Sequence, residues 1–146
     1  MADTTYLKHV VEDAIRDQLA AKYGVPFRSR RVELVTGGTH EFDAVSEDGS
    51  VVVGIKSSGG KTSGGKIPVG KLKAAIAELY YLSLVQAQTR ILVLTDQSFY
   101  QILARRLKGA VAPGLDLHWM QLPAGIQDKV QQVQSQASKE MSAALK

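Results

Sequence analysis

The 146-residue sequence contains no cysteine, which excludes disulfide bonds, cysteine nucleophiles and zinc sites with cysteine ligands. Its three histidines, His9, His40 and His118, are widely separated and give little support for a histidine metal site. No stretch approaches the roughly 18 apolar residues that a membrane span requires. The amino-terminal residues include an early acid and lack an apolar core of signal-peptide length. We therefore expect a soluble, cytoplasmic protein with no membrane partner.

The composition is that of an ordinary globular chain, with 45% apolar and 22% charged residues. The length suits one domain, expected over residues 1–122, with an appended segment over 123–146. The net charge of +4 mildly favours a polyanionic partner. The basic residues gather in three groups: Arg28, Arg30 and Arg31; Lys56, Lys61, Lys66, Lys71 and Lys73; and Arg105, Arg106 and Lys108.

A β-hairpin is predicted over residues 39–57, and the rest of the chain is best understood around it. Residues 39–46 alternate as a strand, residues 47–50 form a turn cluster, and residues 51–57 are apolar enough for a buried strand. Because side chains alternate along a strand, Gly54 and Lys56 share one face. A lysine at the end of so apolar a strand is costly to bury unless its charge is used or paired, and Asp43 across the hairpin offers a partner.

Apolar periodicity predicts the other elements. They are a helix from residue 3 or 4 to about 23, a strand over 31–35, a helix over 71–87, a strand over 91–94, a helix over 98–107 and a strand over 115–120. Strands joined by short turns should be antiparallel, whereas the strand at Ile91 follows a helical crossover and should pair in parallel. We therefore expect an α/β fold with a mixed central sheet flanked by helices.

An extra C-terminal helix is predicted after Pro123. Its apolar residues approximate a heptad stripe set among glutamines: Ile126, Val130, Val133, Ala137, Met141 and Ala144. Such a helix either docks on its own domain or forms the contact of a homodimer, and the pattern does not decide between these.

The order helix, three strands, helix, strand (αβββαβ) resembles that of the PD-(D/E)xK nuclease superfamily, which has the restriction endonuclease-like fold. The family motif places an aspartate on one strand and (D/E)-x-K on the next, where this chain has Glu41–Val45 and Val53–Lys56. The resemblance covers residues 4 to 96. It implies Mg²⁺-dependent or Mn²⁺-dependent hydrolysis of phosphodiester bonds, with DNA as the expected substrate. It also implies that Asp43 ligates the metal and that Lys56 stabilises charge.

The sequence departs from the family motif at one position, where Gly54 stands in place of the second acid. Glycine should leave a void without charge, so that Lys56 faces Asp43 alone as an ion pair. The departure has three interpretations: a degenerate domain that has lost hydrolysis, a single substitution in an intact site, or migration of the acid to the following helix. Migration would make Glu78 a metal ligand, with Glu12 as an additional one. Acids in such helix positions are most often solvated, which is the alternative expectation for both.

The segment from Gly60 to Ile67 comes within one residue of the phosphate-loop pattern, but Ile67 stands where that pattern requires Ser or Thr. Nucleotide binding is therefore not expected. As part of an exposed loop and the start of the next helix, Lys61, Lys66 and Lys71 would instead neutralise phosphates of a nucleic-acid backbone, unless the loop is simply solvated. Two hypotheses follow: a nuclease-like domain, or a catalytically silent module that binds nucleic acid or protein.

Overall fold

The computed structural model describes residues 4–57 and 69–132. Four helices and five strands lie within these ranges when the helix at residues 124–132 is counted. The elements in chain order are α1 (Thr4–Tyr23), β1 (Phe27–Glu33), β2 (Thr39–Ser46), β3 (Val51–Lys56), α2 (Val69–Ser83), β4 (Thr89–Leu94), α3 (Gln97–Arg106) and β5 (Leu115–Trp119). Apart from β1 and α2, these elements begin and end within two residues of the prediction.

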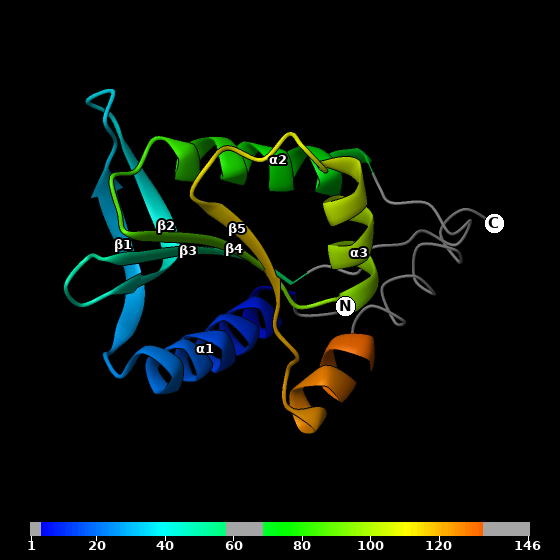
Figure 1. Ribbon diagram of the computed structural model, residues 1–146. Coiled ribbons are helices and arrows are strands. Elements are labelled where there is room, and N and C mark those ends of the chain that lie inside the picture. Colours follow the sequence, from blue (N-terminus) through cyan, green and yellow to red (C-terminus); the bar gives the residue numbers. More distant parts are fainter. Residues whose placement is uncertain (1–3, 58–68, 133–146) are drawn as a thin grey trace.

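The five strands form one mixed sheet in the order β1-β2-β3-β4-β5. The pairs β1/β2 and β2/β3 are antiparallel, and the pairs β3/β4 and β4/β5 are parallel. Figure 1 shows α2 on one side of this sheet and α1 on the other. The predicted α/β class, the mixed sheet and the parallel pairing of the strand at Ile91 are confirmed.

Each face of the sheet is covered by its own apolar cluster. Phe42, Val52 and Leu92 belong to the cluster that packs against α2 and α3. Val53 and Ile91 belong to the cluster that packs against α1. Because β3 is buried on both faces, it is the continuous apolar strand that the sequence predicts. Gly54 and Lys56 therefore share the α2 side with Val52.

Strand β1 begins four residues before the predicted start at residue 31 and ends at Glu33. It is an edge strand, most of its side chains are exposed, and its arginines interrupt any apolar alternation. Leu34, predicted as part of the strand, is buried in the following turn, where its amide donates to the Gly38 carbonyl oxygen at 2.8 Å. An exposed edge strand does not need the apolar pattern by which strands are recognised.

Helix α2 ends at Ser83, four residues before the predicted end at residue 87. The Arg90 guanidinium donates to the carbonyl oxygens of Leu82 and Ser83, at 3.3 and 3.4 Å. The Leu84 carbonyl oxygen accepts a hydrogen bond from the Val35 amide at 2.8 Å. The last carbonyl groups of the helix are thus satisfied by other parts of the chain, and the helix stops although its apolar pattern continues.

The predicted C-terminal helix is present over residues 124–132. Ile126 and Val130 pack into the apolar cluster of the α1 side, so this part of the helix docks on its own domain. The rest of the heptad stripe, from Val133 on, lies outside the described residues, and dimerisation stays a prediction. In the described ranges, no helix combines the length and apolar character needed to cross a membrane.

Candidate functional site

Strands β2 and β3 pair at only two positions, Ala44 with Val53 and Val45 with Val52. Where this pairing ends, a cleft of about 630 Å³ opens between α1, β2, β3 and α2. The charged and titratable residues that line the cleft are Lys8, His9, Glu12, Arg16, His40, Glu41, Asp43, Lys56, Lys71 and Glu78. All residues predicted for the metal site, except the glycine, therefore line one cleft.

A β-bulge in β2 lies at Asp43. The pairing of β1 with β2 shifts in register between Arg28 and Arg30. Across this shift, two residues of β2, Asp43 and Ala44, lie opposite the single residue Ser29 of β1. Bulges re-aim side chains and are frequent beside active sites. The simple alternation expected for residues 39–46 is therefore broken at the candidate ligand.

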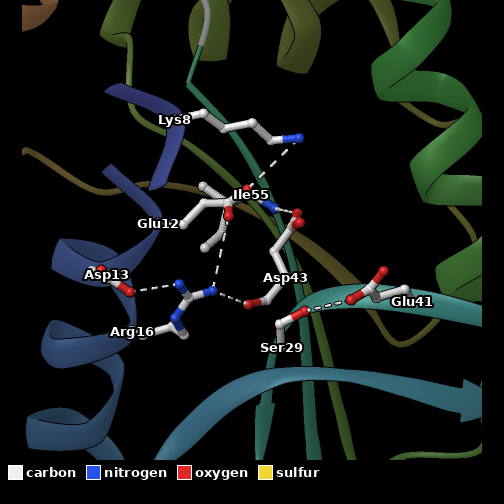
Figure 2. A network of polar contacts seen from close by, with 8 residues as sticks. All are labelled: Lys8, Glu12, Asp13, Arg16, Ser29, Glu41, Asp43 and Ile55. Carbon is white, nitrogen blue, oxygen red and sulfur yellow. Dashed lines mark hydrogen bonds and ion pairs between the residues drawn. The ribbon is translucent and has the colours of Figure 1, made fainter. Parts of the chain in front are cut away.

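The Asp43 carboxylate bridges the two separating strands. Its Oδ2 atom accepts a hydrogen bond from the backbone amide of Ile55 at 2.8 Å (Figure 2). The side chain thus supplies an acceptor to β3 where the backbone ladder with β2 has ended. This bond orients the carboxyl group within the cleft.

The carboxyl group of Glu78 lies directly against Gly54. A Cβ atom at position 54 would approach Glu78 Cγ to 2.7 Å and Glu78 Oε1 to 2.9 Å, which is closer than side chains pack. The void expected at Gly54 is absent, because an acid from α2 fills it. Glycine is required here for that close approach.

His40 holds the other side of the Glu78 carboxyl group. Its Nε2 atom lies 3.3 Å from Glu78 Oε2. The imidazole is stacked on Tyr81, with ring centroids 3.9 Å apart and an interplanar angle of 7°, and it meets the edge of Phe42. His40 was not predicted as a site residue, because from the sequence the histidines were considered only as metal ligands. A separation of three residues would place His40 and Asp43 on opposite faces of a regular strand, so their spacing gave no signal for this contact.

Glu78 is only 8% exposed, so the expectation of a solvated helix acid was wrong. Burial raises the pKa of its carboxyl group above the ordinary value. The positive charges of Lys56 and His40 act against this rise, and the negative charge of Asp43 adds to it. The charges of Asp43 and Lys56, the two residues of the predicted motif, therefore both act on the Glu78 carboxyl group.

Glu12 is buried as well, at 7% exposure, and the expectation that it is solvated was also wrong. Burial raises the pKa of its carboxyl group, and the charge of Asp43 raises it further. Its oxygens lie 4.0 Å from Lys8 Nζ and 3.9 Å from Arg16 Nη1 on the same helix (Figure 2). Lys8 and Arg16 each lie four residues from Glu12, and this helical spacing is the sequence signal for the cluster.

Lys56 is half-buried at the end of β3 and lines the cleft. In the part of the chain that the structure describes, no salt bridge joins it to Asp43. The structural ion pair expected as an alternative is therefore not formed in this arrangement. The positive charge of Lys56 instead acts on Glu78, where it partly offsets the rise in pKa that burial causes.

Among the predicted phosphate-binding lysines, Lys71 lines the cleft, whereas Lys61 and Lys66 lie outside the described residues. The donors that converge on the cleft, Asp43, Glu78 and Glu12, are carboxylates, which suit Mg²⁺ or Mn²⁺. Within residues 4–57 and 69–132, no three acidic or histidine side chains are already arranged to hold a metal ion. Mg²⁺ commonly binds through one or two carboxylates together with waters and substrate phosphates, so the donor set fits it.

The raised pKa of Glu78 predicts a pH-dependent stability. A carboxyl group whose pKa is raised in the folded state stabilises the fold while it is protonated. This contribution is complete at pH values below the ordinary pKa of 4.5, and it is lost as the pH rises through the pKa of the folded state. We expect Glu78→Gln to gain stability relative to the wild type as the pH rises from 4.5 to neutrality. Urea denaturation at a series of pH values measures this difference. A difference that does not change with pH would contradict the raised pKa.

No protein-family model matches this sequence, and neither a curated protein nor a solved structure is significantly similar to it.

Proposed function

We propose that the protein is a PD-(D/E)xK-like, metal-dependent phosphodiesterase that acts on nucleic acid, with DNA as its substrate. Asp43 and Glu78 are its principal metal ligands, Glu12 is an additional one, and Lys56 stabilises charge on the scissile phosphate. One observation carries the proposal: the Glu78 carboxyl group lies against Gly54. The acid missing from β3 is thus replaced by an acid that enters from α2, and migration is the interpretation of Gly54 that we adopt.

The fold supports this proposal. The αβββαβ order, with β4 parallel to β3, agrees with the restriction endonuclease-like core that the sequence resembles. Asp43 and Lys56 lie on neighbouring strands and line the same cleft. Two buried acids whose pKa values are raised by burial and by a neighbouring carboxylate are typical of functional sites.

Each side chain has a distinct task in the proposed reaction. A bound Mg²⁺ or Mn²⁺ would polarise the phosphate and lower the pKa of the attacking water. Asp43, oriented by the Ile55 amide, and Glu78, held by His40, present carboxylate oxygens from two sides of the cleft. The Lys56 ammonium can approach a phosphate oxygen, since within the described ranges no salt bridge engages it.

The cleft also offers cations for a nucleic-acid backbone. Lys8 of α1 and Lys71 of α2 lie on opposite walls of the cleft. Lysines placed beside an acidic centre can neutralise phosphates that flank the reacting one. The predicted contacts of Lys61 and Lys66, the homodimer through the C-terminal helix and the cytoplasmic location belong to this proposal as well.

Incubation of the purified protein with plasmid and single-stranded DNA, with RNA in parallel, tests the proposal. We expect cleavage that requires Mg²⁺ or Mn²⁺ and that ends when EDTA is added. A folded protein that is inert with either ion on all three substrates would contradict the proposal. That result would favour the second hypothesis, a catalytically silent interaction module. The exposed apolar side chains of Val69, Ile76 and Tyr80 on α2 would then be its first candidate surface.

A further inference from the structure

The Arg16 side chain connects α1 to the bulge of β2. Its Nη1 atom donates a hydrogen bond to the backbone carbonyl oxygen of Asp43 at 2.7 Å (Figure 2). Its Nη2 atom donates to Asp13 Oδ1 at 2.6 Å, and Nη1 lies 3.9 Å from Glu12 Oε2. The side chain is only 15% exposed. Two of its three partners lie on its own helix, and the third is main chain of the candidate metal ligand.

The bulge explains why a carbonyl oxygen at this position needs a donor from another element. A bulged strand carries one residue more than its partner, and that residue is left out of the regular ladder. Here Asp43 and Ala44 share the single partner Ser29. A partly buried carbonyl group without a donor is unfavourable, and the Arg16 guanidinium supplies that donor. Arg16 therefore stabilises the bulged conformation over a regular strand.

The same bulge decides which face of the sheet each following side chain occupies. Phe42 and Val45 both pack on the α2 side, and Ala44 packs on the α1 side. A regular strand would place Phe42 and Val45 on opposite faces, because their separation is an odd number of residues. Loss of the bulge would therefore force the residues on one side of Asp43 to change face, and this would alter the main chain that carries the Asp43 carboxylate.

We propose that Arg16 is a positioning residue that fixes the Asp43 carboxylate by holding the main chain of the β2 bulge. The inference rests on the proposed function, because it assigns Arg16 a part in preparing that site. The guanidinium acts through Asp43 and contacts neither metal nor substrate. Groups that orient a metal ligand typically change metal affinity by 10-fold to 100-fold when removed, on the order-of-magnitude scale seen in other metal sites.

The rival role for Arg16 is direct contact with a substrate phosphate, since it also lines the cleft. The two roles differ in the property that loss of Arg16 would change. A phosphate contact alters the salt dependence of DNA binding by about one counterion. A positioning role alters the Asp43 hydrogen bond to Ile55 even when neither DNA nor metal is present.

The experiment compares wild type, Arg16→Met, Arg16→Lys and Asp13→Ala in the full chain. Asp13→Ala removes the exposed partner of the same guanidinium and is the matched control. Hydrogen exchange of the Ile55 amide is measured by NMR relative to that of Leu92, which lies opposite Gly54 in the interior strand β4. The dissociation constant for Mn²⁺ alone is measured by calorimetry, and DNA binding is measured in Ca²⁺ at several salt concentrations.

We expect Arg16→Met to speed Ile55 exchange about fivefold relative to Leu92, as the loss of a typical hydrogen bond would, and to weaken Mn²⁺ binding about tenfold. Arg16→Lys, which keeps a cationic donor, should recover part of both effects, and Asp13→Ala should show neither. Equal acceleration at Ile55 and Leu92, or unchanged Ile55 exchange, would overturn the inference. So would a changed salt dependence with unchanged Mn²⁺ affinity. If wild type binds no Mn²⁺, the proposed function fails, while Ile55 exchange still decides the role of Arg16.

Discussion

Asp43→Asn is expected to lower metal-dependent DNA cleavage by roughly 10³-fold while the protein stays folded. A metal ion contributes several kcal/mol to the stabilisation of charge in the transition state, and each 1.36 kcal/mol is a factor of about ten in rate. Asparagine retains a side-chain oxygen that can accept the hydrogen bond from Ile55, which Asp43 Oδ2 now accepts at 2.8 Å. The substitution therefore removes the charge of the ligand without removing the bond that orients it.

Initial cleavage rates with Mn²⁺ measure this loss, and thermal unfolding shows whether the fold is intact. Glu41→Gln is the matched control. Glu41 lies on the same strand and lines the same cleft, but it is exposed, and its carboxylate accepts a hydrogen bond from the Ser29 hydroxyl group. We expect the control to cleave at nearly the wild-type rate. Similar losses in both variants would show that the effect is not specific to the proposed ligand.

Gly54→Ala is expected to destabilise the fold by about 1–3 kcal/mol, the usual cost of overpacking a buried site. The new methyl carbon would come within 2.7 Å of Glu78 Cγ, and β3 is buried on both faces, so the acid must leave its place. Cleavage should fall with stability, because the displaced carboxyl group is a proposed ligand. Urea denaturation and cleavage rates measure the two effects. Gly70→Ala on α2, where a methyl group meets no other atom within 4 Å, is the control and should be close to neutral.

Exchanging the residues at positions 54 and 78 tests whether Glu78 takes the place of the missing strand acid. Glu78→Gly should abolish cleavage, and Gly54→Glu alone should be both destabilised and impaired, since two carboxyl groups compete for one space. The double variant Gly54→Glu/Glu78→Gly should recover stability relative to Gly54→Glu and regain part of the cleavage. A double-mutant cycle quantifies the coupling, which for residues in contact is about 0.5–3 kcal/mol. Independent, additive effects would show that Glu78 does not stand in for the missing strand acid.

The parts of the fold that were predictable from the sequence are those set by local pattern. Residues 39–46 form β2 as predicted, and the Glu47–Ser50 turn cluster marks the end of the strand, although the bulge at Asp43 breaks the alternation of its side chains. Strand β4 was recognisable by its continuous apolar run, and Asp96 caps α3 through its side chain. These signals arise from residues that are neighbours in the chain, so they can be recognised without the tertiary structure.

The features that were not predictable depend on contacts between distant segments. The burial of Glu78 follows from the packing of α2 over Gly54, which nothing in the helix sequence alone specifies. The bulge at Asp43 is stabilised by Arg16, which is 27 residues earlier in the chain. The early end of α2 depends on Arg90, from the next strand. In each case a polar side chain reaches across elements, whereas sequence periodicity reports only apolar faces.

The sequence named four catalytic-site residues that line the cleft, but it assigned neither His40 nor Arg16 to this site and did not predict how the residues are arranged. Asp43, Lys56, Glu78 and Glu12 were all named from the sequence, and all four line one cleft. The predicted void at Gly54 and the predicted exposure of the two glutamates were wrong for the same reason. Both followed from treating each helix acid as a surface residue, although the separation of β2 and β3 leaves space for carboxyl groups between the layers.

The most direct measurement of the central claim is anomalous X-ray diffraction from crystals soaked with Mn²⁺. The proposed function predicts one strong anomalous peak in the cleft, in coordination contact with carboxylate oxygens of both Asp43 and Glu78. Crystals of Asp43→Asn soaked in the same way should show a much weaker peak at that position. A wild-type cleft without a peak, or a peak that contacts neither carboxylate, would contradict the claim that an acid from α2 completes the metal site.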